Sequence, residues 1–109
     1  MNAVVIEWVE KGESDYRVAV RESQAINPPE PDAVCFHAQQ CVEKYVKAFL
    51  VERGVEFDYI HNMPYLHGKC VSADPEFNSY KDDFDALDDY SVDLRYPGIR
   101  QRKRTLGQP

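Results

Sequence analysis

Five basic side chains near the C-terminal end of the sequence have the chemistry to bind phosphate. An arginine guanidinium can donate two parallel hydrogen bonds to a phosphate, whereas lysine offers a compact ammonium charge. Two other roles are open. The cation of Arg95 can stabilise the C-terminal end of a helix, and the basic residues that follow it can form an ordinary solubilising tail. The candidate residues for binding nucleic acid or a nucleotide are Arg95, Arg100, Arg102, Lys103 and Arg104.

The rest of the sequence is acidic. The net charge of the protein is −6, but four of its 13 basic residues and none of its 19 acidic residues follow residue 98. Residues 1–98 therefore carry nine basic and 19 acidic residues, a formal charge of −10. This balance excludes non-specific attraction of nucleic acid to the body of the protein and restricts any such contact to a local basic patch.

The histidines and cysteines do not form a metal-binding pattern. On a helix, Cys35 lies about 160° from His37, so these two and Cys41 cannot converge on one ion, although His37 and Cys41 share a face. His61 precedes a predicted helix, where a histidine typically orients a turn, and His67 falls on another face. We expect no metal site and no cofactor. The sequence also contains no phosphate-binding glycine loop and no Ser-His-Asp set.

Length and composition bound the type of protein. With 109 residues, of which 43% are hydrophobic, the sequence suits one small globular domain with a modest core. It contains no run of about 18 apolar residues and no charged-then-apolar leader, so we expect neither a membrane span nor a signal peptide. Three cysteines do not indicate a secreted disulfide framework, which favours a cytoplasmic location.

Residues 32–54 are predicted to form the central helix of the fold. Asp32 is expected to cap its first amides, and Gly54 to end it in the left-handed conformation. The apolar residues cover an arc of roughly 200°, which is wider than one neighbouring helix can cover and predicts a bundle. The polar arc is expected to face water and carries a Glu43–Lys47 pair, with Phe36 pointing into it. The apolar arc contains Val34, Cys35, Ala38, Cys41, Val42, Tyr45, Val46, Ala48, Phe49 and Leu50, and the polar arc His37, Gln40, Glu43, Lys44 and Lys47.

A first helix is predicted over residues 3–25. Gly12 lies inside it and costs about 1 kcal/mol relative to alanine. This glycine marks either a break at Ser14 or a close approach of the central helix, and we favour one continuous helix. The prolines of residues 27–31 make a stiff turn, so the first and central helices form an antiparallel hairpin. The side predicted to face the core carries Val5, Trp8, Val9, Gly12, Tyr16, Ala19 and Val20.

Two shorter helices are predicted over residues 63–71 and 76–94. Asn62 is expected to cap the first of them. The second has an apolar stripe that should pack on the central helix, and an acidic cluster that reads as a solvated face, with a divalent-cation site as the remote alternative. We divide the chain into a helical domain over residues 1–98 and a basic, flexible tail over residues 99–109. The stripe contains Phe77, Tyr80, Phe84, Leu87, Ser91 and Leu94, and the cluster Asp82, Asp83, Asp85, Asp88 and Asp89.

Four segments of the sequence, in order along the chain, resemble the HEPN domain family. The sequence AQQCVEKYVKAFL at 38–50 resembles the second helix of that family, and EWVEKGESDYRVA at 7–19 resembles its first helix. His61, Asn62 and Met63 resemble its His-Asp-Leu entry to the third helix. YSVDLRYPG at 90–98 resembles its Arg-Tyr-Pro ending.

This resemblance implies an all-α, up-and-down antiparallel bundle of about four helices that forms a homodimer. It also implies a nucleotidyltransferase partner in a toxin-antitoxin arrangement. Active members of the family are metal-independent ribonucleases that carry an Arg followed, a short distance later, by a His. Arg95 matches that Arg, but the corresponding positions 100–102 hold Arg, Gln and Arg. Relatives also continue into a further amphipathic helix that this sequence lacks, which would leave a groove on the central helix for a second subunit or a partner helix.

The missing His decides between two functional hypotheses. Cleavage of RNA through its 2′-hydroxyl needs a group that accepts a proton near neutral pH, and arginine stays protonated. Our first hypothesis is therefore a non-catalytic or weakly active dimer that binds a nucleotide or RNA and acts with a nucleotidyltransferase. The alternative is a ribonuclease toxin that uses Arg95 as its catalytic residue, helped by Arg100 or by His61.

Overall fold

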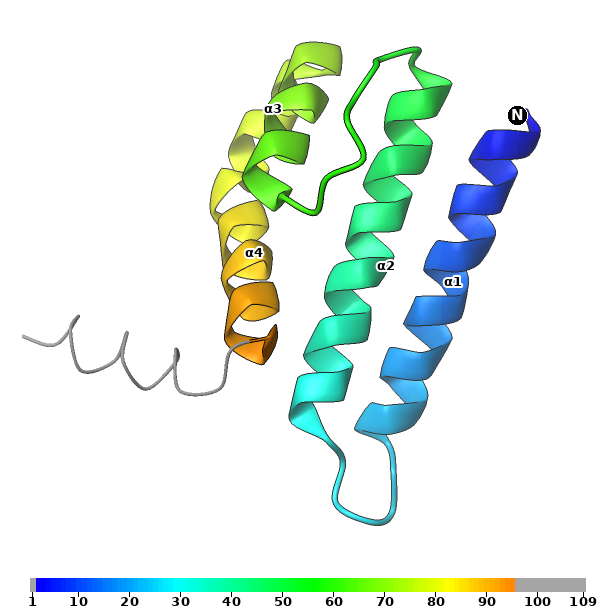
Figure 1. Ribbon diagram of the computed structural model, residues 1–109, viewed down its shortest axis with the longest axis vertical. Coiled ribbons are helices and arrows are strands. Elements are labelled where there is room, and N and C mark those ends of the chain that lie inside the picture. The colour runs from blue at the N-terminus through cyan, green and yellow to red at the C-terminus, as the bar shows by residue number, and fades with distance from the viewer. Residues whose placement is uncertain (1, 96–109) are drawn as a thin grey trace, which may run out of the picture.

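The computed structural model describes residues 2–95, which form four α-helices and one 3-10 helix (Figure 1). No β-strand occurs in this range. The elements are α1 (Ala3–Ser23), α2 (Pro31–Glu52), α3 (Met63–Ala73), the 3-10 helix η1 (Pro75–Tyr80) and α4 (Lys81–Arg95). The predicted all-α helical bundle is therefore confirmed.

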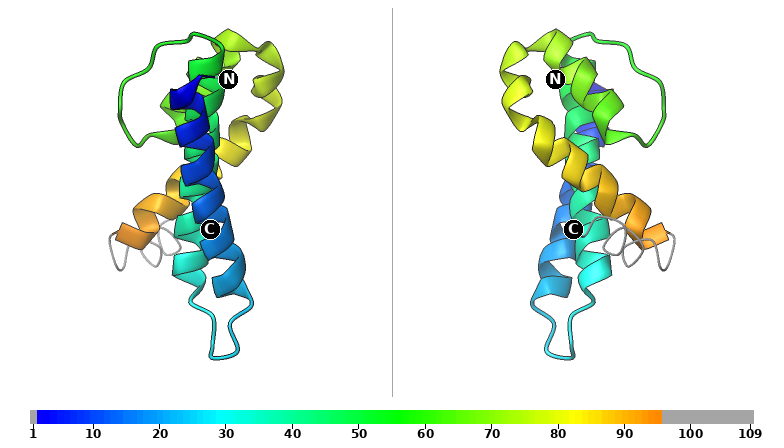
Figure 2. Two further views of the ribbon diagram at one scale, coloured as in Figure 1. Left: turned by 90° about the vertical axis from the view of Figure 1, so that its right-hand side faces the viewer. Right: turned by 90° about the vertical axis from the view of Figure 1, so that its left-hand side faces the viewer.

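The helix α2 is the centre of the fold. It lies between α1 on one side and α3 and α4 on the other (Figure 1). After α2, the loop of residues 53–62 runs back beside it before α3 begins, and α4 then crosses the hairpin obliquely (Figures 1 and 2). Among the helices of residues 2–95, α1 packs against α2 alone, and it also contacts the loop through Trp8 and Tyr59. The prediction that α2 needs more than one helical neighbour is confirmed.

The first helix is continuous through its glycine, as predicted. A Cβ atom placed on Gly12 would lie 3.0 Å from ring carbons of Tyr45, so the glycine allows α1 and α2 to approach closely. Asn2 caps the helix, because its side chain accepts a hydrogen bond of 2.9 Å from the amide of Val5. Tyr16 was expected to face the core, but it is 59% exposed, and this prediction was wrong.

The predicted C-terminal end of α2 is correct, whereas the predicted N-terminal end is wrong. Gly54 has a φ of 70°, the left-handed conformation expected just after a helix. Asp32, however, is not the N-cap. The helix begins one residue earlier, at Pro31, because a proline fits the first helical position, where no amide donor is needed.

The main hydrophobic core lies where the C-terminal half of α2 meets α3 and α4. Leu50, Met63 and Leu66 are completely buried there. Around them pack the aromatic rings of Phe49 and Phe77, whose centroids are 5.1 Å apart. The buried residues of this core are Val46, Leu50, Met63, Leu66, Cys70 and Phe84, and partly buried residues against it include Val42, Val55, Phe57, Tyr65 and Leu87.

The last predicted helix is divided into two elements. Pro75 starts the 3-10 helix η1, and the side chain of Asp74 accepts a hydrogen bond of 3.0 Å from the amide of Glu76. The regular helix α4 begins only at Lys81. Phe84 faces the core as predicted, but Tyr80 sits in the tighter 3-10 turn and is half-exposed, so its assignment to the packed stripe was wrong.

The largest error concerns the polar side of α2. Glu43 and Lys47 do form the predicted pair, with 2.9 Å between Oε1 and Nζ, but they are only 1% and 4% exposed. Trp8 of α1 lies beside Lys47, and His61 from the returning loop contacts Glu43. The wet face that the helical pattern predicted is therefore largely covered by the loop and by α1.

None of the helices between residues 2 and 95 combines the length and the apolar character that crossing a membrane requires.

Candidate functional site

Of the five predicted basic residues, Arg95 alone lies in the part of the chain that the structure describes. Arg95 is the last residue of α4. Arg100, Arg102, Lys103 and Arg104, like the whole predicted tail, lie outside the described residues. Their role in binding nucleic acid or a nucleotide, and the role of Arg95, stay predictions.

A buried carboxylate dominates the polar interior beneath the loop of residues 53–62. Oε1 of Glu43 accepts hydrogen bonds from Lys47 Nζ at 2.9 Å and from His61 Nδ1 at 2.7 Å. Oε2 accepts from the amide nitrogens of Gln39 at 3.2 Å and Gln40 at 3.5 Å. These donors hold the buried carboxylate in one orientation.

His61 is the outward end of this network. Its side chain is 58% exposed, while its partner Glu43 is buried. In the tautomer that donates Nδ1–H to this carboxylate, the other ring nitrogen, Nε2, carries the lone pair, and it makes no hydrogen bond to residues 2–95. A buried carboxylate that fixes the tautomer of an exposed imidazole is the arrangement by which proteins prepare a general base.

The other two histidines have structural contacts. His67 is buried, and its Nε2–H donates a hydrogen bond of 2.7 Å to the carbonyl oxygen of Phe77, which ties α3 to η1. His37 lies 2.9 Å from Asp15 and joins α2 to α1. Lys44 contacts the same carboxylate. Burial raises the pKa of Asp15, but the hydrogen bonds from Lys44 and His37 outweigh it and hold that pKa below its usual value.

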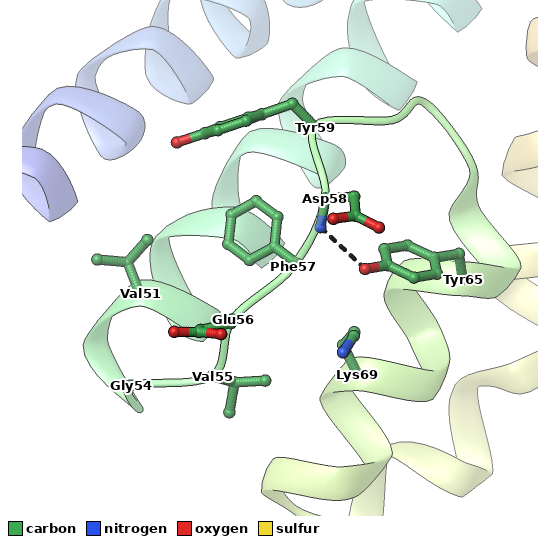
Figure 3. Close-up of a pocket in the computed structure, with 9 residues that line it drawn as sticks. All are labelled: Val51, Gly54, Val55, Glu56, Phe57, Asp58, Tyr59, Tyr65 and Lys69. Atoms are coloured by element: carbon green, nitrogen blue, oxygen red, sulfur yellow. Dashed lines mark hydrogen bonds between the residues drawn. The ribbon is translucent and has the colours of Figure 1, made fainter.

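An open groove of about 580 Å³ lies between the returning loop and α3 (Figure 3). The hydroxyl of Tyr65 accepts a hydrogen bond of 2.9 Å from the amide of Asp58, and the ammonium of Lys69 lies 5.7 Å from the centre of the Tyr65 ring. Two carboxylates, those of Glu56 and Asp58, share this lining with that one ammonium. The charge of the groove therefore does not favour a phosphate.

Comparison with known families gives one match. The sequence model of the HEPN domain matches residues 5–107. The chain belongs to the HEPN domain family. Searches among curated proteins and among solved structures found no match to this HEPN chain.

Sequence reasoning missed the polar network beneath the loop. Gln39, Glu43 and Lys47 are spaced four residues apart, so they form one row along α2. An amphipathic pattern assigns such a row to solvent, and only a covering segment can bury it. The signal for that segment was the alternation of Val55, Phe57 and Tyr59 with the acidic residues Glu56 and Asp58, which is the pattern of a chain that lies with one side against the protein.

Proposed function

We propose that this HEPN protein is a non-catalytic or weakly active dimer that binds a nucleotide or RNA and acts with a nucleotidyltransferase partner in a toxin-antitoxin arrangement. A HEPN domain indicates a function related to nucleotides or RNA, and this is the coarser statement on which the proposal rests. The finer parts, which are the dimer, the partner and the toxin-antitoxin role, come from the family resemblance.

One observation carries the non-catalytic reading: no histidine follows Arg95 in the sequence. Two of the three histidines, His37 and His67, are engaged in contacts between helices. An arginine stays protonated and can stabilise the charge of a phosphate without accepting the proton of a 2′-hydroxyl. Arg95 therefore suits binding of phosphate better than it suits cleavage.

The ribonuclease alternative has one observation in its favour. His61 presents an exposed imidazole that the buried Glu43 orients through Nδ1. If two copies of the chain placed His61 of one beside Arg95 of the other, a base and a cation would meet at one phosphate. This arrangement replaces the missing histidine with one from a different part of the fold.

An apolar groove between α1 and α2 supports the dimer. Its volume is about 290 Å³, and it is lined mainly by alanine and valine side chains. A second copy that covers it would shield apolar surface, including the exposed ring of Tyr16, from water. The lining residues are Tyr16, Ala19, Val20, Ser23, Val34, Ala38, Cys41 and Val42.

A metal-free RNA cleavage assay separates the two functions. The purified wild type is compared with the Arg95→Ala and His61→Ala variants on a mixed RNA substrate, with His37→Ala as the matched histidine control. The proposal expects no cleavage by any of them, together with binding of the same RNA by the wild type. Cleavage by the wild type that is lost in both Arg95→Ala and His61→Ala, but kept in His37→Ala, establishes the ribonuclease instead.

Partner and oligomeric state need two further measurements. Co-purification with the product of a neighbouring nucleotidyltransferase gene is the expected result for the partner. Failure to bind either that protein or nucleic acid contradicts the proposal. A mass measurement that finds only monomer at micromolar concentration removes the dimer.

A further inference from the structure

Two aromatic rings face one another across the space between α1 and the returning loop. Trp8 lies on α1, and Tyr59 extends from the loop toward α1, as the close-up in Figure 3 shows. Their ring centroids are 6.5 Å apart and their planes differ by only 25°. Rings of an offset pair in direct contact have centroids about 4.5–7 Å apart, and the outer rings of a three-ring stack lie about 7 Å apart. The observed spacing fits both arrangements, so it is the open space beside the rings that favours a ligand.

Open space borders both rings on the surface of α1. A cavity of about 200 Å³ is lined by both Trp8 and Tyr59, together with Val4, Glu7 and Lys11. Tyr59 is 78% exposed, so its ring can move outward to admit a planar ligand without disturbing the core. This volume is below the range of about 300–1,000 Å³ that is typical of sites for drug-sized ligands, so the cavity suits a single planar ring system.

Charged side chains that can contact a phosphate and a ribose lie around the two rings. The ammonium of Lys11 lies at the cavity and is paired with Glu7 at 3.3 Å, with both side chains exposed. The buried ammonium of Lys47 lies 5.3 Å from the centre of the Trp8 ring. A lysine can contact a phosphate, and a carboxylate can accept from an exocyclic amine or a ribose hydroxyl. Parallel rings with these groups at their edge match a nucleobase that carries a phosphorylated ribose.

We propose that Trp8 and Tyr59 bind the base of a nucleotide between their rings, with Lys11 contacting its phosphate. The proposal rests on the nucleotide- or RNA-binding function proposed above and assigns that function a site. The base can belong to a free nucleotide or to single-stranded RNA, because both present the same base, ribose and phosphate. The site lies on the face formed by α1 and the loop, on residues other than Arg95 and the basic tail.

Trp8 reports on its own site, because it is the single tryptophan of the chain. The full-length protein is titrated with AMP, with a short oligo(A) RNA and with ribose 5-phosphate, and tryptophan emission is followed. Saturable quenching by AMP or by oligo(A), without an equal response to ribose 5-phosphate, is expected, and the arm that responds identifies the source of the base. Equal responses to ribose 5-phosphate and AMP overturn insertion of the base.

Variants of Tyr59 test the clamp by calorimetric titration, which does not depend on tryptophan emission. Tyr59→Leu is expected to weaken binding about tenfold or more, as loss of a base-stacking ring does, whereas Tyr59→Phe keeps the ring and should keep the affinity. Tyr80→Leu, at a half-exposed tyrosine outside both proposed sites, is the matched control and should bind like the wild type. Unchanged binding by Tyr59→Leu overturns the clamp while leaving the proposed function intact. Absence of all binding by the wild type overturns both.

Discussion

Replacing Lys47 with methionine is the sharpest test of the polar interior. The substitution keeps the length and the apolar stem of the side chain but removes the ammonium that pairs with Glu43 at 2.9 Å. The carboxylate that remains is 1% exposed and cannot recover a full hydration shell. Breaking a buried ion pair from one side costs about 3–5 kcal/mol of unfolding free energy, because a buried charge is left without its partner.

The lower end of that range is expected here. His61 and Gln39 still donate to Glu43 in the variant, so its oxygens keep part of their hydrogen bonding. A loss of about 3 kcal/mol corresponds to a fall in the melting temperature of roughly 12–24 °C for a domain of this size. Since small domains have total stabilities of about 5–15 kcal/mol, Lys47→Met should fold but melt early.

Urea unfolding followed by circular dichroism measures this loss. The matched control is Lys81→Met, which removes the ammonium of an exposed pair with Asp85 at 2.8 Å and should shift the midpoint little. The double variant Glu43→Leu with Lys47→Met should be much more stable than the sum of the single losses predicts, because no lone charge remains. If Lys47→Met unfolds at the same urea concentration as Lys81→Met, the buried network does not have the energetic role described here.

Three further predictions concern the glycines within helices, the cysteine thiols and the loss of stability at low pH. Gly68→Ala should raise the unfolding free energy by about 1 kcal/mol, since no atom lies within 4 Å of its added Cβ. Gly12→Ala should show little or none of this gain, because its added Cβ meets the ring of Tyr45 at 3.0 Å. Equal gains in the two variants would refute the close approach of α1 and α2. A thiol reagent should modify native Cys35 first and Cys70 last, because burial raises the pKa of the Cys70 thiol to about 11, and mass spectrometry of the labelled peptides checks the order. The lowered pKa of Asp15 means that its carboxylate adds stability at neutral pH and that this stability is lost as the pH falls through that lowered pKa. Asp15→Asn should therefore lose less stability between about pH 7 and pH 3 than the wild type, and parallel curves would contradict this.

The sequence predicted the helices better than it predicted their surroundings. The starts of α1 and α3 and the turn after α2 depend on short-range signals, such as the side chain of Asn62, which accepts from the amide of Tyr65 at 2.8 Å. The burial of Glu43 depends instead on where a loop that follows ten residues later comes to lie. Helical periodicity contains no information about such a return. For the same reason, the pattern alone could not place Trp8 beside Tyr59.

The buried charges beneath the loop are better explained by positioning than by stability. An apolar pair of similar volume at positions 43 and 47 would cover the same surface at no cost of desolvation. Such a pair would not, however, bond to His61 or attract the ring of Trp8 to a buried ammonium. His61 and Tyr59 are two residues apart in the same loop, so the bond that anchors one limits the movement of the other. Loss of Glu43 is therefore expected to release the loop and weaken the proposed base site, although Glu43 does not line it.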